Sequence, residues 1–391
     1  MAEVSVVIPV YNSEKTLAAC LDSVIAQTFA DVEVICINDG STDGSGAIID
    51  DYAARDPRIL VRHQENIGQH PSRNVALGLV RGRYMLSVDC DDAIAPHLVE
   101  RAYYRAEAEA ADITLLGWDY LTGPYAPPDL ATWNLRDWTA RSPATGFPLG
   151  FGYVWMKLYR KEFLDRHSLR FNEEFYTKAD LIFHWKSMSL AERICVVPEP
   201  LYHYRVHGNS ITGTIGNRFV QVIGVMEAIR AELGNIGDPK GLLRLWPHFA
   251  LTFLHGTYQQ TAHQHRTEMR AALWRFVSHL DPAEQRAFRE PGQLPRHMRN
   301  FYLSLESPAA AFRYGTLFQA RGALMAGIRA VLLPVGLKRR LLEFVRKRSY
   351  TLSRSSTAEL RDTILELNDL VNRLAADNHR LRARVREDER D

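Results

Sequence analysis

Apolar runs of strand length alternate with helical patterns between residues 4 and 88. The runs lie at 4–10, 32–37, 59–62 and 83–88, and the segments between them place apolar residues at helical spacing. Buried strands that alternate with helices in this way form βαβ units around a parallel sheet. The sequence therefore predicts an α/β domain with a doubly wound sheet, in which ligands bind at the carboxyl ends of the strands.

Polar turns follow three of these runs, at Tyr11, at Asp39 with Gly40, and at residues 89–92. Because the carboxyl ends of parallel strands meet at one edge of the sheet, we expect the three turns to contribute to one site. Gly40 lets the backbone approach a ligand closely, and Asp39 then accepts hydrogen bonds from a base or a ribose. The alternative is structural, since the sequence around Asp39 also suits a turn and a helix cap.

The last of these runs ends directly in three carboxylates, Asp89, Asp91 and Asp92. Like charges this close raise one another's free energy, and a strand end beside a core desolvates them. A bound cation offsets that cost, and oxygen ligands suit Mg²⁺ or Mn²⁺, which complete their shells with substrate phosphates. The alternative is a solvated turn in which Asp92 caps a helix over residues 96–110.

Four motifs, in this order and at this spacing, resemble glycosyltransferase family 2. They lie at residues 5–12, 38–43, 66–68 with 72–74, and 89–92. The resemblance covers residues 1–215 and implies the GT-A fold, a Rossmann-like nucleotide-diphosphosugar transferase domain. Members of the family are inverting, metal-dependent enzymes, so the resemblance also implies a nucleotide-sugar donor and Mn²⁺ or Mg²⁺ as cofactor.

The resemblance assigns roles to individual residues of these motifs. Pro9, Tyr11 and Asp39 are expected to line the nucleobase pocket. Arg73 is expected near the diphosphate or the nucleobase. By the same resemblance, Asp89 contacts the ribose or the metal ion, and Asp91 binds the metal ion.

The match is looser in the second half of the resemblance. Asp180 stands where the family has its catalytic base, a carboxylate that takes the proton of the acceptor hydroxyl. Ala179 replaces the Glu that usually precedes this Asp, which leaves open how Asp180 is oriented or how the acceptor is held. Without the family match, Asp180 reads more simply as a helix N-cap. His207 matches a histidine that reaches the metal or the diphosphate in some relatives, and its alternative is a hydrogen-bonded surface residue.

The pattern becomes helical after residue 216, and we expect an α-helical region over 216–350. Its basic cluster at residues 338–348 lies beside apolar stretches that are too short and too interrupted to span a bilayer. Such a segment either packs on the catalytic domain or lies on an anionic membrane face. The lipid-linked acceptors common in the family favour peripheral membrane contact.

The tail repeats leucine every seven residues, and a second apolar series precedes it by three positions. The leucines are Leu360, Leu367, Leu374 and Leu381, and the second series is Ile364, Val371, Asn378 and Val385. β-Branched residues at a, leucine at d and one Asn at a favour a parallel two-stranded coiled coil. We therefore predict a C-terminal coiled coil at 355–388 and a homodimer. A partner protein, or a lone helix packed on its own chain, is the alternative.

Composition and charge indicate which partners and which cellular location to expect. The net charge is +2 over 391 residues, so no nucleic-acid partner is expected. The four cysteines are widely spaced, and the first strand begins too early to leave room for a secretory signal. We expect a cytoplasmic protein, peripheral at the inner face of the cell membrane.

The sequence thus predicts an inverting, metal-dependent hexosyltransferase. It moves a sugar from a nucleotide-sugar, by resemblance a UDP-sugar, to a surface polysaccharide or a lipid-linked glycan. The alternative is a catalytically inactive scaffold that organises other enzymes through its coiled coil. Ala179 keeps that alternative open, whereas the intact Arg73, Asp91 and Asp180 argue against it.

Overall fold

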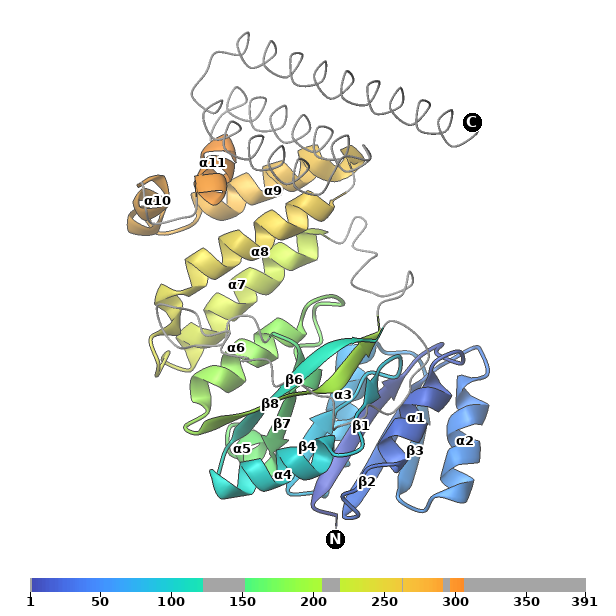
Figure 1. The fold of residues 1–391 in the computed structure, drawn as a ribbon. Coiled ribbons are helices and arrows are strands. Elements are labelled where there is room, and N and C mark those ends of the chain that lie inside the picture. Colours follow the sequence, from blue (N-terminus) through green and yellow to red (C-terminus); the bar gives the residue numbers. More distant parts are fainter. Residues whose placement is uncertain (1, 122–151, 206–218, 262, 291–295, 306–391) are drawn as a thin grey trace, which may run out of the picture. The chain divides into compact units, whose positions relative to one another are not determined.

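The computed structural model describes residues 2–121, 152–205, 219–261, 263–290 and 296–305 (Figure 1). The chain divides into two compact units, Met1–Ala272 and Leu273–Asp391. The coiled-coil segment 355–388, the basic cluster and His207 lie outside the described residues.

The first unit is built on an eight-stranded sheet with the order β3-β2-β1-β4-β7-β6-β8-β5. The strands are β1 (Val4–Val10), β2 (Val32–Asp39), β3 (Ile59–Gln64), β4 (Tyr84–Ser87), β5 (Ala93–Ile94), β6 (Ile113–Leu121), β7 (Lys157–Arg160) and β8 (Ile194–Arg205). Its helices are α1 (Leu17–Ile25), α2 (Ser45–Arg55), α3 (Gln69–Leu77), α4 (Leu98–Ala108), α5 (Lys161–Arg166), α6 (Asp180–Leu190), α7 (Phe219–Asn235) and α8 (Trp246–Gln260).

The predicted alternation of strands and helices is confirmed as β1 to β4, which pair in parallel around β1. Beyond β4 the sheet is mixed, because β7 is antiparallel to both β4 and β6, and β5 is antiparallel to β8. A strand that joins the sheet in the opposite direction leaves no mark in the apolar pattern, so the sequence did not predict it.

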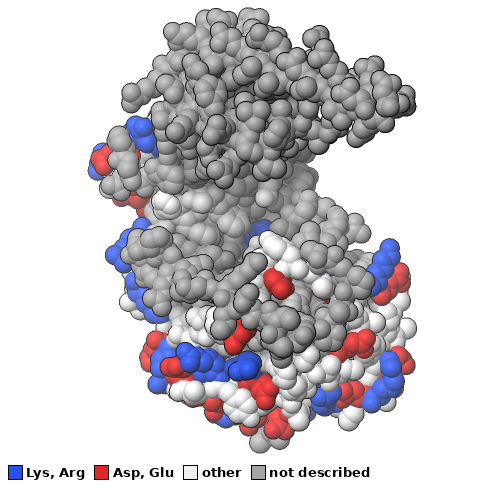
Figure 2. Space-filling model, viewed as in Figure 1, with Lys and Arg blue, Asp and Glu red and all other residues white. Residues whose placement is uncertain are grey.

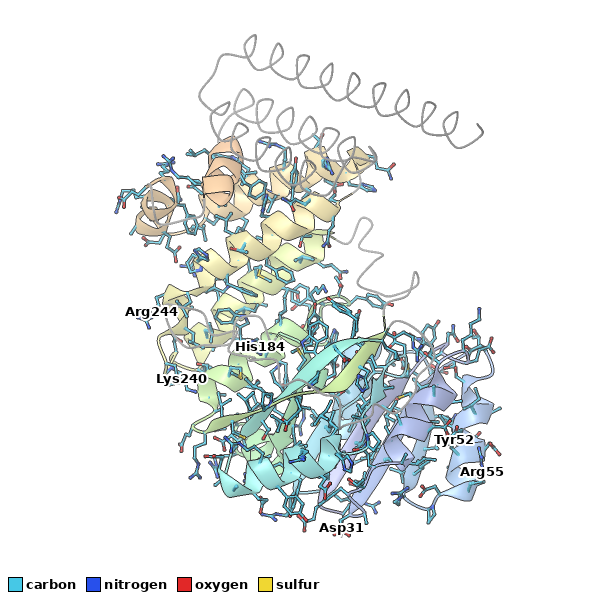
Figure 3. The ribbon with its side chains drawn as sticks, in the orientation of Figure 1. Asp31, Tyr52, Arg55, His184, Lys240 and Arg244 are labelled. Atoms are coloured by element: carbon cyan, nitrogen blue, oxygen red, sulfur yellow. The ribbon has the colours of Figure 1, made fainter. Side chains whose placement is uncertain are left out.

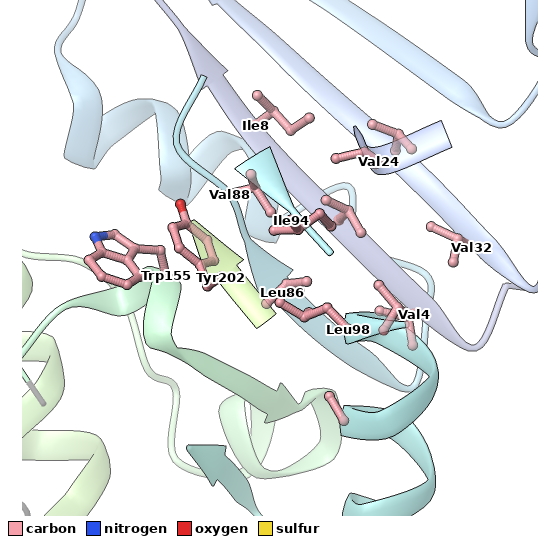
Figure 4. Packing of buried hydrophobic residues seen from close by; sticks show 14 of the residues in the cluster. Val4, Ile8, Val24, Val32, Leu86, Val88, Ile94, Leu98, Trp155 and Tyr202 are labelled. Carbon is pink, nitrogen blue, oxygen red and sulfur yellow. The ribbon is translucent and has the colours of Figure 1, made fainter. Parts of the chain in front are cut away.

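The core explains why the first strand reads as a continuous apolar run. All seven residues of β1 are buried, as expected for a central strand with both faces covered. Figure 4 shows the packing on one of these faces, where Leu86 and Val88 lie close to Ile94 and to the Trp155–Tyr202 pair. This packing fixes the end of β4, from which the carboxylate cluster continues.

Helices α7 and α8 belong to the same compact unit as the sheet. Lys186 on α6 forms an ion pair with Glu232 on α7 at 2.8 Å, and the rings of Trp185 and Phe249 lie 4.9 Å apart. Lys240, labelled in Figure 3, donates hydrogen bonds to carbonyl oxygens at the end of α6. The change of sequence pattern near residue 216 therefore lies inside a unit that continues to Ala272.

The second unit contains the end of α9 (Arg266–Ser278), followed by α10 (Pro282–Arg289) and α11 (Arg296–Leu305). The rings of Phe288 and Tyr302 pack with centroids 5.4 Å apart and join α10 to α11. In the described parts of the chain, no helix has the length and apolar character needed to cross a membrane.

Candidate functional site

The turns after β1 and β2 lie side by side, as the sequence predicted. Val10 pairs with Asn38, so the two strands end together. The backbone N–H of Asn12 donates to Ser41 Oγ at 3.1 Å, and the N–H of Thr42 donates to Asn12 Oδ1 at 2.8 Å. The Tyr11 side chain remains 48% exposed at this edge and is open to a ligand.

Asp39 is buried and holds the loop before α3. Its Oδ1 accepts hydrogen bonds from the Ile67 N–H and the Gln64 amide, both at 2.9 Å, and its Oδ2 accepts one from the Gly68 N–H at 2.8 Å. Gly40, with a φ of +69°, has no room for a side chain, because a Cβ would lie 2.7 Å from the Asn66 nitrogen. The close approach at Gly40 is therefore to the chain's own loop.

Helix α3 places Arg73 against the carboxylate cluster. The guanidinium is 3% exposed, and its Nη2 donates to Asp89 Oδ1 at 2.5 Å. Its Nε has no hydrogen-bond partner among the described residues. One turn earlier on the same helix lies His70, which is also buried.

The three carboxylates at the end of β4 have different environments. Oxygen atoms of Asp89, Asp91 and Asp92 lie within 4.8 Å of one another. Asp92 is fully buried and accepts hydrogen bonds from the Tyr202 hydroxyl at 2.7 Å and the Arg205 N–H at 2.8 Å. It therefore positions the turn. Helix α4 begins at Leu98 with His97 before it, so the alternative that made Asp92 its cap is wrong.

Burial makes this cluster costly to keep charged. It raises the pKa of Asp89 to about 6, a shift that the Arg73 guanidinium opposes and the Asp91 charge increases. Burial and the two neighbouring aspartates also raise the pKa of Asp92. A divalent cation would relieve this repulsion, and carboxylate oxygens are the ligands that Mg²⁺ and Mn²⁺ prefer. The donor set of Asp89 and Asp91 fits such an ion.

Asp180 reaches the same pocket from a distant part of the chain. It is the first residue of α6, and the residue before the helix, Ala179, makes no side-chain capping bond. The alternative in which Asp180 is the N-cap is therefore wrong. The Asp180 side chain lines one pocket together with Arg73, Asp89 and Asp91.

An aromatic wall borders this pocket, formed by Tyr153, Trp155 and Tyr204. The ring of Trp155 stacks on Tyr153 with centroids 5.3 Å apart, and on Tyr204 with centroids 5.5 Å apart. Lys157 lies behind the wall and is fully buried. Its Nζ donates to the Tyr153 carbonyl at 2.6 Å, which ties the wall to β7.

The pocket thus brings together four of the predicted site residues, Arg73, Asp89, Asp91 and Asp180. Pro9, Tyr11 and Asp39 do not line it. Pro9 is buried within β1, and the other two residues follow or end neighbouring strands at the same edge of the sheet.

Sequence reasoning missed three residues that the structure places in or beside the site. His70 lies between the two parts of the motif at 66–68 and 72–74, and it received no role. Tyr202 positions the turn from 89 to 92, because its hydroxyl accepts a hydrogen bond from the Asp89 N–H at 3.1 Å and donates to Asp92. Lys157 received no role, and an isolated lysine in an apolar run was the available signal.

A protein-family model matches the part of the chain that contains Arg73 and the carboxylate cluster. The family model described as glycosyl transferase family 2 matches residues 5–168. That range includes β1 to β4, α3 and the carboxylate cluster, and it ends before Asp180.

Curated proteins of similar sequence carry related descriptions. An uncharacterized glycosyltransferase of Bacillus subtilis, EpsJ, is 36% identical over 218 residues, which cover 54% of this chain and 62% of EpsJ. The poly(ribitol-phosphate) beta-glucosyltransferase of Bacillus spizizenii is 31% identical over 208 residues, which cover 52% of this chain and 32% of that protein. The chain therefore spans less than two thirds of these relatives.

A solved structure shares the fold. S. aureus TarS 1-349, in complex with UDP, superposes with a TM-score of 0.59 at 22% sequence identity. The match covers 78% of this chain and 87% of that one, so the likeness extends beyond the sheet into the helices.

Proposed function

We propose that this chain, whose residues 5–168 match the model of glycosyl transferase family 2, transfers a sugar from a nucleotide-sugar to a glycan with inversion at the anomeric carbon. One observation carries the proposal. A single pocket contains Arg73 and two strand-end carboxylates together with Asp180, a carboxylate from a separate helix. The transfer needs a stabilised leaving group and a general base, and these residues supply one of each.

The leaving-group end of the pocket is formed by Arg73, Asp89 and Asp91. We propose that Asp91, with Asp89, holds Mn²⁺ or Mg²⁺, which stabilises negative charge on a diphosphate when it is bound. Arg73 adds a positive charge that burial keeps from being screened by water. Its hydrogen bond to Asp89 keeps the guanidinium and the carboxylate in fixed positions.

Asp180, which lines the same pocket, is our proposed general base. The acceptor oxygen forms a bond to the anomeric carbon, and its proton passes to the Asp180 carboxylate. The bond from that carbon to the diphosphate oxygen breaks in the same step. A single displacement of this kind inverts the anomeric configuration. For this transfer, the acceptor hydroxyl must bind within hydrogen-bond distance of the Asp180 carboxylate.

We propose UDP as the nucleotide, because the structure of similar fold is described in complex with UDP. Pro9 and Tyr11 are proposed to contact the nucleobase from the carboxyl end of β1. Asp39 supports this pocket by holding the Ile67 and Gly68 N–H groups.

The acceptor is proposed to be a surface polysaccharide or a lipid-linked glycan. A relative named as a poly(ribitol-phosphate) beta-glucosyltransferase supports an acceptor of the polymer class. The domain boundaries stay predictions, with a catalytic domain at 1–215 and a helical region at 216–350. Peripheral membrane contact of the helical region and a coiled-coil homodimer through 355–388 stay predictions as well. A contact of His207 with the metal or the diphosphate also stays a prediction.

Release of UDP from UDP-sugars, with Mn²⁺ and with EDTA, tests the proposed function. Wild type is expected to turn over at least one donor in a metal-dependent way. Asp91→Asn should lower that rate by at least about 100-fold, because the leaving charge loses its main stabilisation. Asp165→Asn, which changes an exposed carboxylate on α5, is the matched control and should keep the wild-type rate. Wild-type protein that turns over no donor would contradict the proposal.

A further inference from the structure

His70 is a buried polar residue that no part of the proposed chemistry uses. It lies on α3, lines the pocket and is 4% exposed. Its ring stacks on Phe171 with centroids 6.3 Å apart. Its Nδ1 has no hydrogen-bond partner in the described part of the chain. Buried polar atoms in native proteins have partners, so an unpaired ring nitrogen beside a pocket indicates that a ligand completes its bonding.

The position of His70 indicates which part of a ligand it meets. It precedes Arg73 by three residues on α3, so the two side chains share a face of the helix. Arg73 contacts Asp89 at the leaving-group end, and the charge of Asp180 also acts on His70. His70 therefore lines the pocket within electrostatic reach of both Arg73 and the proposed base, and we place the transferred sugar beside it.

The charge state of His70 indicates what kind of group it binds. Burial and, to a lesser extent, the Arg73 charge lower its pKa to about 4, and the Asp180 charge opposes the shift. The imidazole is therefore neutral near pH 7, with one donor and one acceptor nitrogen. A neutral ring adds no charge toward a phosphate, whereas a sugar hydroxyl, which both donates and accepts, is complementary to it.

We propose that the His70 imidazole hydrogen-bonds a hydroxyl group of the transferred sugar and thereby helps to select the donor. The inference rests on the proposed function and names a specificity-determining residue for it. Sites built to hydrogen-bond a substrate hydroxyl discriminate strongly, because their buried polar groups stay unpaired with the wrong substrate. Arg73 and a cation held by the carboxylates would bind the diphosphate of every donor, so His70 distinguishes sugars without affecting the nucleotide.

Calorimetric binding in the presence of Mn²⁺ separates these contributions. The probes are UDP alone and UDP-glucose, UDP-galactose and their N-acetylated forms. For the sugar that binds wild type best, His70→Phe should lose about 10- to 100-fold in affinity while the affinity for UDP alone is unchanged. His70→Asn, which returns an amide near the Nδ1 position, should recover part of the loss. His167→Phe changes a half-buried histidine after α5 that does not line the pocket, and it is the matched control.

Each outcome decides the inference. Equal losses for UDP and for the UDP-sugar would contradict it, because His70 would then act on the nucleotide or on the fold. Unchanged donor affinity together with a raised KM for the acceptor would contradict it as well. Failure of every UDP-sugar to bind the wild-type chain would contradict the proposed function itself, which distinguishes the two failures.

Discussion

Single side chains in this protein show how burial sets their chemistry. Asp89 and Asp92 both follow β4, yet Asp92 is committed to Tyr202 and Arg205 while Asp89 bonds Arg73 inside the pocket. Sequence spacing alone made the three carboxylates equivalent candidates for a metal ion. Their difference depends on residues of β8, more than a hundred positions away, and no local pattern reveals such partners.

The buried Lys157 is expected to make the free energy of unfolding depend on pH. Burial lowers its pKa to about 7, against an ordinary value of 10.5, and Asp180 opposes the shift. Between these values the unfolded chain binds more protons than the folded chain, so stability rises with pH. The contribution reaches at most about 1.4 kcal/mol per pH unit. Below pH 7 the lysine is charged in both states, and its burial cost no longer changes with pH.

Urea unfolding between about pH 7 and 8 measures this effect, in a range where the thiols of the unfolded chain stay mostly protonated. Lys157→Met should flatten the rise seen in wild type, because the apolar side chain has no proton to lose. A variant whose unfolding free energy rises as steeply as that of wild type would show that another group is responsible.

Secondary-structure elements were predicted well where apolar runs of strand length alternated with segments of helical spacing. Strands β1 to β4 and their intervening helices follow from apolar runs and helical spacing. The boundaries shifted by a few residues, as for the helix expected at 96–110 and found at Leu98–Ala108. The mixed half of the sheet was not predicted, because the pairing of β7 with β4 and β6 is decided by contacts across the sheet.

Gly117 marks the place where β6 departs from regular pairing with β8. The register shifts on both sides of this residue, and a Cβ here would lie 2.4 Å from the Glu199 carbonyl oxygen. Gly117→Ala should lower the free energy of unfolding by about 1–3 kcal/mol, because backbone atoms must move. Gly256→Ala is the control, since a Cβ on that α8 glycine meets nothing within 4 Å. It should raise stability by about 0.5–1 kcal/mol. Equal melting temperatures for the two variants would contradict the account.

At the scale of the whole molecule, the candidate site belongs to the first compact unit. Residues from α3, the end of β4, the segment before β7 and the start of α6 line one pocket. The family resemblance had named its carboxylates and Arg73 from separate motifs, and the fold brings them together. His70 and the two tyrosines of the aromatic wall emerged from the structure, because a histidine or a tyrosine in sequence has no feature that separates a pocket wall from a core. On the face shown in Figure 2, acidic and basic side chains of the described residues are intermixed.

The role of Asp180 is the central claim, and one pair of measurements tests it directly. Asp180→Asn keeps the size of the side chain and removes its ability to accept a proton. With the donor found for wild type, the variant should lose about 100- to 10,000-fold in kcat for transfer, while its calorimetric affinity for that donor with Mn²⁺ stays within about twofold. A variant that transfers sugar at the wild-type rate would contradict the assignment of Asp180 as the general base.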